Sequence, residues 1–405
     1  MCAATVIGVG SLPVALFGLR QLASTTTDQL SGPAQITDFV AIYSGARLLI
    51  TDPAHLYAPG AVAAIDQSLT DTDRFDRPFS FLPNAALLLA PLGATPYGPA
   101  YAVWLIVGLV ALWLSIWLLA PQRWLWPMLL ALFLPVQLAL IMGQTPPLAL
   151  LAFCGLVRLL SRRSTLAGVL LGLSPVTWKP QLFLPTFTVA LLAGRRWRTV
   201  AGLLGVPALL CGAVLAVAGL HLIGDYQQQG AEMLTQVGTG RSVESAGQTV
   251  LGLCQAMFGP GSIAAALGIA GSVVVELAIG LMWWRGLRND GRCDLQLAAL
   301  PIAAVLAAPH ALGYELTTWL ASAWLLLRYA ETRASAMPVV IGLCLTGWLT
   351  GNIIILTEND IGFPWAAVQG VATLGVIVWL YASHPPADHV PESADVNRKP
   401  SYTSA

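Results

Sequence analysis

The chain has 405 residues, of which 56% are hydrophobic and only 10% are charged. Soluble domains carry about 25% charged residues, so this composition excludes an ordinary water-soluble protein. The formal net charge is zero, which gives no support for nucleic-acid binding. The six cysteines are scattered, mostly within apolar runs and without a CxxC pair, so neither a disulfide framework nor a zinc site is indicated.

The distribution of basic residues predicts a membrane topology. Thirteen of the 18 arginines and one of the two lysines fall in short loops and a tail that alternate with long apolar runs. Short loops rich in Lys and Arg stay in the cytoplasm, and a spanning helix needs roughly 20 mainly apolar residues. These rules predict an all-α bundle of about 12 transmembrane helices with both termini in the cytoplasm.

The N-terminal quarter combines one apolar run with a long polar segment. Residues 1–19 lack a preceding basic segment and are expected to form a transmembrane helix rather than a cleaved signal. Residues 21–98 are expected to form an extracytoplasmic loop with short interfacial helices. Within it, residues 78–96 are apolar but too short to span a bilayer, which favours an interfacial or re-entrant helix.

The rest of the chain alternates between spans and loops. Residues 165–194 lie between two basic loops and should go out and come back as two short helices, with Lys179 at the outer turn. An outer loop is expected at 223–261. Residues 1–382 therefore form one transmembrane domain, and 383–405 a disordered cytoplasmic tail. Further spans are predicted at 99–120, 124–142, 145–161, 199–222, 262–284, 295–309, 312–330, 335–356 and 364–382.

Asp38 is the first polar residue that could carry chemistry. It lies in the first outer loop, five residues before Tyr43. A carboxylate at a membrane–water boundary can act as a general base that takes a proton from an acceptor hydroxyl. The alternative is that Asp38, after Thr37, only caps a short helix.

Lys179 is the one lysine within the apolar region, between Trp178 and Pro180. Its ammonium group is a compact point charge suited to phosphate, and ionisable residues within membranes are functional by default. The alternative is an anchor that extends to the interface beside a tryptophan. Gln144 is expected at another outer turn, where it could also serve only as a helix cap.

His310, Tyr314 and Glu315 lie where one predicted span ends and the next begins. The histidine could bind a phosphate or act as an acid, while Tyr314 and Glu315 could hold a sugar. The alternative is an ordinary helix junction at the membrane edge. No other His, Cys or Asp stands at ligand spacing from His310, which argues against a metal.

Glu276 lies in the middle of a predicted span, so its side chain should face other helices or be protonated. It is the main support for a second function class, a transporter or flippase of lipid-linked sugars or small solutes. Such a protein needs polar groups along a path through both faces. In this chain the polar groups gather at the outer face, which favours an enzyme.

Several short motifs follow one another in an order that is more specific than any one of them. Over roughly residues 35–330, this order resembles glycosyltransferase family 87, GT-C-fold membrane enzymes that include polyprenyl-phosphate-mannose-dependent mannosyltransferases. The motifs are Asp38-Phe-x-x-x-Tyr43, Leu56-Tyr57, Phe79-Ser-Phe81-Leu-Pro83, Gly143-Gln144, Gly168-Val-Leu-Leu-Gly172, Lys179-Pro180, Arg195-Arg196-Trp197, Pro309-His310 and Tyr314-Glu315.

The resemblance implies a GT-C-like fold, a sugar donor on a polyprenyl phosphate and inversion at the anomeric carbon. The family often has Tyr-Pro-Pro where this chain has Phe81-Leu82-Pro83, and an Asp where it has Glu315, one methylene longer. On the matching positions, the catalytic base is Asp38, and the donor-binding residues are Lys179, His310, Tyr43, Gln144, Tyr314 and Glu315.

The sequence therefore predicts an integral membrane hexosyltransferase of the cell (inner) membrane with an extracytoplasmic active site. It would transfer a hexose, with mannose the expected sugar, to a lipid or glycan acceptor. Its expected partners are this donor, this acceptor and membrane lipids, without nucleic acid. Nothing in the sequence requires a metal or another cofactor. An inactive family member acting as an assembly subunit is a third alternative.

Overall fold

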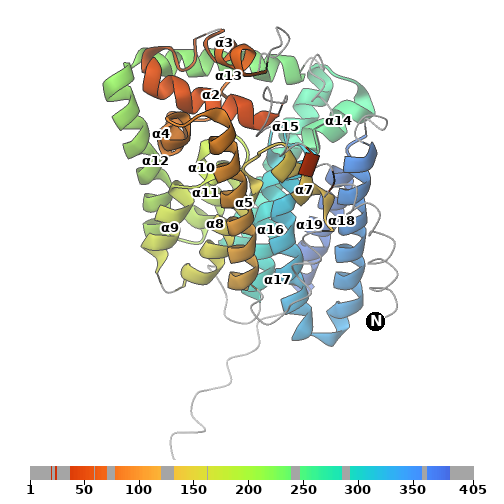
Figure 1. Ribbon diagram of the computed structural model, residues 1–405. Coiled ribbons are helices and arrows are strands. Elements are labelled where there is room, and N and C mark those ends of the chain that lie inside the picture. The colour runs from red at the N-terminus through yellow and green to blue at the C-terminus, as the bar shows by residue number, and fades with distance from the viewer. Residues whose placement is uncertain are drawn as a thin grey trace, which may run out of the picture.

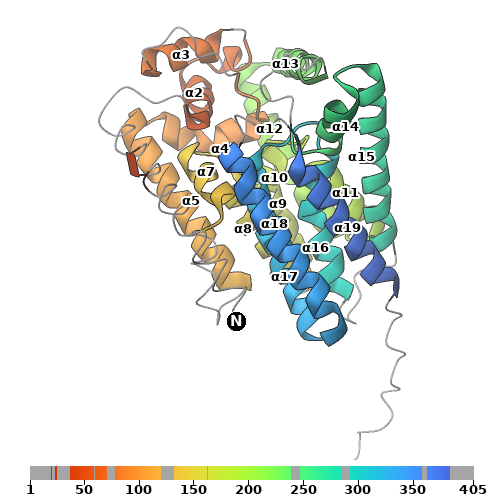
Figure 2. The same cartoon turned by 90° about the vertical axis from the view of Figure 1, so that its right-hand side faces the viewer.

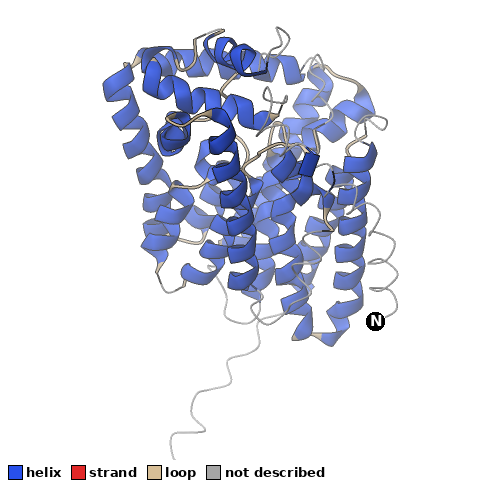
Figure 3. Ribbon diagram, viewed as in Figure 1, coloured by secondary structure: helices blue, strands red, loops and turns tan. Residues whose placement is uncertain are grey.

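The regular secondary structure in the described part of the chain is entirely helical, as predicted (Figure 3). The molecule is represented by a computed structural model of residues 1–405. It describes residues 20, 23, 24, 37–58, 60–70, 78–119, 132–161, 163–238, 247–284, 292–357 and 363–383. The predicted first span at 1–19 and nearly all of the predicted tail at 383–405 lie outside these residues.

Five of the described helices are long and apolar enough to cross a membrane. Each coincides within a few residues with a predicted span, and their outward faces are apolar. On one of them Leu277 is 61% exposed and Leu281 is 75% exposed. Soluble proteins rarely expose such continuous apolar surface, so this is a membrane protein. The five are α5 (Tyr97–Leu119), α12 (Trp197–Ala218), α15 (Ser262–Trp283), α18 (Met337–Thr357) and α19 (Trp365–Ser383).

The other predicted spans form shorter helices in their described parts. Residues 165–194 give two short helices around the Lys179 turn, as expected, with one extra helical turn between them. The total of about 12 spans stays a prediction, because none of these shorter helices reaches spanning length. They are α7 (Leu134–Ile141), α8 (Pro146–Leu159), α9 (Ser164–Gly172), α10 (Pro175–Trp178), α11 (Leu184–Ala193), α16 (Arg292–Ala307) and α17 (Trp319–Glu331).

A layer of shorter helices lies across one end of the long ones (Figures 1 and 2). It contains α2 (Asp38–Thr51), α3 (Ala61–Thr70) and α13 (His221–Gly238), while α4 (Pro83–Gly93) packs beneath α2. Gly93 permits this packing, because a Cβ there would lie 2.5 Å from the Ala46 carbonyl carbon. Of these helices, α2, α3 and α4 fall within residues 21–98, where short helices were predicted, whereas α13 comes from a later part of the chain.

The prediction of a loop at 223–261 is wrong, because this stretch is largely helical where the structure describes it. The stretch is occupied mainly by α13 and by α14 (Val250–Phe258). Within α13, Gln228 donates to Glu232 one turn later at 3.1 Å. Such i, i+4 pairs support a polar helix.

The core of the bundle is built around α16. Nearly every residue from Leu295 to Leu306 is buried, which is expected of a helix that is apolar on all sides. A second cluster lies around α2 and the start of α5, where Phe39 packs against Tyr97, Tyr101 and Trp104. This aromatic cluster fixes the first turn of α2, which carries Asp38.

Small residues bring α9 and α12 into close contact. A Cβ on Gly168 would lie 2.2 Å from the Thr199 carbonyl oxygen, and one on Gly172 would lie 2.6 Å from the Gly202 carbonyl oxygen. Glycines spaced four residues apart let membrane helices approach in this way. The contact holds α9 firmly, and α9 leads directly into the segment that carries Lys179.

Candidate functional site

Asp38 is the first residue of α2 and is buried, with 7% of its surface exposed. The N-cap residue is Thr37, so Asp38 is not the cap, and the Thr37 side chain makes no capping hydrogen bond. The Phe39 amide donates to the Met142 carbonyl at 3.0 Å. This bond ties the start of α2 to the turn between α7 and α8, and brings Asp38 beside Gln144.

Gln144 is held in that turn by backbone geometry. Its amide donates to the Ala139 carbonyl at 2.7 Å, and the Trp104 indole donates to the Gly143 carbonyl at 2.7 Å. Gly143 has a φ of +63°, and a Cβ there would lie 2.5 Å from the Phe39 Cβ. Only glycine fits both demands, which explains why Gly143 precedes Gln144.

Lys179 directly follows the single helical turn α10. The Ser174 hydroxyl accepts from the Val176 amide at 3.3 Å and caps this turn, and Thr177 donates to the Gly172 carbonyl at 2.9 Å. The Trp178 carbonyl accepts from the Leu82 amide at 3.0 Å. The turn is therefore tied to both α9 and α4, so the Lys179 ammonium is aimed inward rather than toward an interface.

The Lys179 ammonium joins residues from three distant segments. It donates to the Gln144 side-chain oxygen at 2.8 Å and to a Glu315 carboxylate oxygen at 2.9 Å. The Gln144 side-chain nitrogen in turn donates to the Asp38 carboxylate at 2.6 Å. The result is a continuous chain, Asp38–Gln144–Lys179–Glu315, which we call the acid–lysine chain. These bonds exclude the alternative that the Lys179 side chain extends to the membrane surface as an anchor.

Aromatic rings flank the lysine. The Lys179 nitrogen lies 5.5 Å from the centroids of the Phe81 and Tyr314 rings, within the range of cation–π attraction. Tyr314 and Glu315 belong to the 3-10 helix η3 (Gly313–Thr318) and are buried. Phe81 was not among the predicted site residues, although its motif Phe79-Ser-Phe81-Leu-Pro83 was part of the resemblance.

The acid–lysine chain carries two carboxylates and one ammonium, all shielded from water. The side chains of Lys179 and Glu315 are 13% and 4% exposed. Buried ion pairs are maintained only with good geometry and further hydrogen bonds, and Gln144 supplies such bonds to both Lys179 and Asp38. The site therefore combines a cation suited to an anionic ligand with a carboxylate able to accept a proton.

Two other predicted site residues, His310 and Tyr43, have different surroundings. His310 stands in the turn between α16 and η3, where a Cβ on Gly247 would lie 3.3 Å from its Nδ1 atom. Tyr43 faces elsewhere, because its hydroxyl donates to the Thr95 carbonyl at 2.8 Å. Its predicted role in donor binding stays a prediction.

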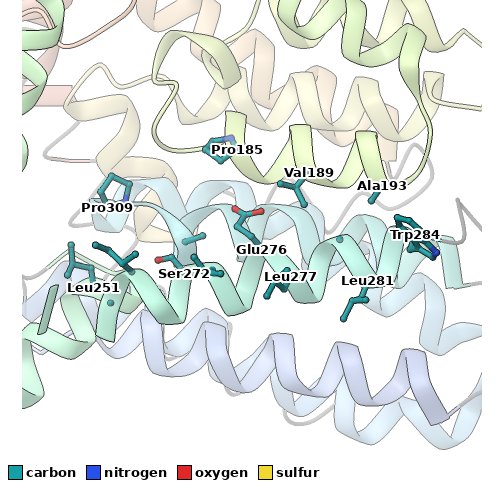
Figure 4. Close-up of a pocket in the computed structure, with 15 residues that line it drawn as sticks. Pro185, Val189, Ala193, Leu251, Ser272, Glu276, Leu277, Leu281, Trp284 and Pro309 are labelled. Atoms are coloured by element: carbon teal, nitrogen blue, oxygen red, sulfur yellow. The ribbon is translucent and has the colours of Figure 1, made fainter. Parts of the chain in front are cut away.

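A groove of about 550 Å³ runs along α15 and is bounded by α11 on its other side (Figure 4). Pro309 and Leu251 lie toward one end, and Trp284 and Ala193 toward the other. Glu276 lies on its wall and accepts a hydrogen bond from Thr186 at 2.5 Å. Because Pro309 precedes His310, the groove ends close to the polar residues described above.

Fold and site together define a helical membrane protein in which one ammonium group and two carboxylates are joined in a single hydrogen-bonded cluster. A family model of glycosyltransferase family 87 matches residues 79–312, and the chain belongs to this family. It is therefore a membrane glycosyltransferase by family, as the motif order predicted. The matched range contains Gln144, Lys179 and His310, whereas Glu315 lies three residues beyond its end and Asp38 lies 41 residues before its start. Searches of curated proteins and of solved structures gave no match.

Proposed function

We propose that the protein transfers a hexose, with mannose the expected sugar, from a polyprenyl-phosphate donor to a lipid or glycan acceptor at the extracytoplasmic face. The observation that carries this proposal is the acid–lysine chain, which places a cation and a buried carboxylate in one hydrogen-bonded unit. A glycosyl phosphate donor needs both groups, one at the leaving phosphate and one at the acceptor hydroxyl.

The Lys179 ammonium is proposed to bind the donor phosphate, with His310 as a second contact. As the bond between the anomeric carbon and the phosphate oxygen breaks, negative charge grows on the phosphate. A cation aimed at that oxygen stabilises the transition state more than the ground state. Tyr314 and Glu315, which contact Lys179 from η3, are proposed to hold the sugar.

Asp38 is proposed as the general base. The acceptor hydroxyl transfers its proton to the Asp38 carboxylate while the hydroxyl oxygen forms the new bond to the anomeric carbon. The polyprenyl phosphate leaves with the electrons of the broken bond, so the sugar changes configuration once. Gln144, which donates to Asp38 at 2.6 Å, orients the carboxylate and keeps it hydrogen-bonded.

The groove along α15 supports a lipid-linked donor. From Gly268 to Trp284 it follows α15 and its C-cap residue over 16 residue steps, or about 24 Å of helix, a large part of a hydrocarbon core of about 30 Å. Its lining is apolar except for Ser272 and Glu276. A polyprenyl tail in this groove would have its phosphate near Pro309 and His310.

The extracytoplasmic orientation rests on the charge of the loops. The layer of α2, α3 and α13 lies across one end of the long helices (Figure 1), and α2 begins with Asp38 of the acid–lysine chain. The opposite end of α12 carries Arg195, Arg196 and Arg198, which should remain in the cytoplasm. The site is therefore proposed to face the other compartment.

Glycosyl transfer in nanodiscs tests this function. The donor is radiolabelled polyprenyl-phosphate-mannose and the acceptor a total lipid extract, with wild type compared with Asp38→Asn. Asp52→Asn is the matched control, because Asp52 is exposed and pairs only locally with His55. Labelled product with wild type and the control, but not with Asp38→Asn, is expected. No product and no donor binding with any variant would overturn the proposal.

A further inference from the structure

A pocket with polar lining residues lies beside α2, on the side of the helix that carries Tyr43. Its volume is about 490 Å³. It is lined by residues of α2, of α3 and of the turn between α4 and α5. Tyr43, Arg47 and Thr51 are spaced by four residues along α2 and so form one stripe. The lining residues used below are Tyr43, Arg47, Thr51, Ile65, Ser68 and Pro96.

Arg47 supplies the only positive charge among the lining residues. One guanidinium nitrogen donates to the Gly93 carbonyl at 3.0 Å, which fixes the side chain and leaves other N–H groups directed elsewhere. Within the described residues no carboxylate lies at ion-pair distance from Arg47. An arginine fixed in this way offers a planar set of donors that matches phosphate.

The hydroxyl groups of the pocket share one property. Tyr43, Thr51 and Ser68 each donate their proton to a backbone carbonyl, of Thr95, Arg47 and Ile65 respectively. Each oxygen therefore keeps its lone pairs for a ligand. The pocket thus offers donors at Arg47 and acceptors at the hydroxyls, which suits a ligand that has both an anionic group and hydroxyl groups.

The position of the pocket relates it to the membrane surface. Pro96 directly precedes α5, so the pocket lies at the N-terminal end of a candidate span. Ile50, one turn beyond Arg47 on α2, is 47% exposed, and Ile65 adds an apolar wall. A charged group with apolar neighbours at the end of a spanning helix lies at the depth of lipid headgroups.

We propose that this pocket binds the headgroup of an anionic phospholipid, with the phosphate at Arg47 and headgroup hydroxyls at Ser68 and Thr51. The site is distinct from the acid–lysine chain, because Asp38 and Arg47 are nine residues apart and so point to opposite faces of α2, about 180° around the axis. A lipid bound there braces the helix that carries Asp38 against the bilayer.

Native mass spectrometry of the full chain in detergent tests the proposal. The probes are phosphatidylglycerol, which has a phosphate and free hydroxyls, phosphatidylcholine, which lacks the hydroxyls, and a neutral galactolipid, which lacks the phosphate. Arg47→Gln is compared with Arg198→Gln, since Arg198 is an exposed arginine at the start of α12. Ser68→Ala removes one acceptor at an exposed position, and Arg47→Lys keeps the charge if Arg47→Gln fails to fold.

Wild type and Arg198→Gln should retain phosphatidylglycerol more tightly than either other lipid. Arg47→Gln should weaken its binding about tenfold or more, the change expected when a charge-assisted hydrogen bond is lost, and Ser68→Ala should weaken it less. Equal retention of the three lipids, or no change in Arg47→Gln and Arg47→Lys, would overturn the proposal. Because retention needs no turnover, its failure is distinguishable from a failure of glycosyl transfer.

Discussion

The ammonium of Lys179 lies 2.9 Å from the carboxylate of Glu315, although 136 residues separate them in the chain. The contact joins the turn after α10 to η3 and thereby connects the middle of the chain to its last third. The side chain of Glu315 is buried and that of Lys179 is only 13% exposed, so the pair constrains the fold as well as the chemistry of the site.

Replacing Lys179 by methionine should reduce both stability and activity. The substitution leaves the Glu315 carboxylate buried without its partner, which costs about 3–5 kcal/mol in comparable buried pairs. Thermal unfolding in detergent measures this loss. The double variant Lys179→Met/Glu315→Gln should recover most of the stability but no glycosyl transfer. Recovery of transfer in the double variant would show that Lys179 has only a structural role.

Replacing Gln144 by leucine should mainly lower turnover. Leucine keeps the approximate volume but leaves Asp38 and Lys179 without the amide between them, so both charged groups lose orientation. Loss of one hydrogen bond to a charged group costs about 1.5–3 kcal/mol, which predicts a decrease in kcat of about tenfold to a hundredfold. A change confined to the KM for the donor, with kcat unchanged, would assign Gln144 to binding alone.

Replacing Gly143 by alanine should destabilise the protein. The backbone there has a φ of +63°, and the new methyl group would collide with Phe39. A residue forced into such a conformation costs about 1–3 kcal/mol. Gly205→Ala is the matched control, because a Cβ at Gly205 in α12 meets no atom within 4 Å and alanine favours helix over glycine. Equal melting temperatures for the two variants would contradict the prediction.

A bulky side chain placed in the groove along α15 should affect donors with a long tail more than donors with a short tail. Gly280 lines the groove, and a Cβ there would lie 3.5 Å from Val189, so Gly280→Phe should obstruct the passage between α11 and α15. The KM for a long-chain polyprenyl donor should rise, whereas a donor with a one- or two-isoprene tail should be used as before. Gly212→Phe, in open space on α12, is the control. A uniform effect on both donors would exclude the groove as the tail site.

A substitution of Glu276 distinguishes the proposed enzyme function from the transporter alternative. Its hydrogen bond to Thr186 belongs to the groove wall rather than to the acid–lysine chain. Glu276→Gln keeps the shape and the bond, so glycosyl transfer should remain within a few-fold of wild type. If the variant instead abolished movement of a lipid-linked sugar across vesicles while transfer was never detectable, the transporter alternative would gain support.

The sequence indicated the residues of the site better than their contacts. Gln144, Lys179 and Glu315 were identified as polar residues at the turns between apolar runs, which need an explanation in a membrane protein, and Asp38 as a carboxylate in the first predicted outer loop. Their hydrogen bonds join segments that lie 106, 35 and 136 residues apart, and no local pattern specifies such pairs. Tyr43 shows the same limit, because its spacing from Asp38 turns it to another face of α2.

Long apolar runs were predicted well because length and hydropathy alone identify a spanning helix. The apolar runs that contain α8, α11 and α16 were also predicted as spans, but the helices themselves are shorter than a spanning helix. Their ends depend on prolines, glycines and tertiary contacts rather than on composition. The helix α13 was not predicted because it is polar and gives no hydropathic signal, whereas it is supported by a side-chain pair within the helix and by single contacts to Ala54, Tyr57 and Phe79.

Donor binding and product formation, measured together in one nanodisc preparation with radiolabelled polyprenyl-phosphate-mannose, would test most directly whether Asp38 acts as the base. Asp38→Asn should bind the donor about as well as wild type, because Lys179 and His310 are unchanged, and should form product at least about a hundredfold more slowly. Product formation by Asp38→Asn at the wild-type rate, with normal donor binding, would contradict the role of Asp38 and with it the proposed chemistry of the acid–lysine chain.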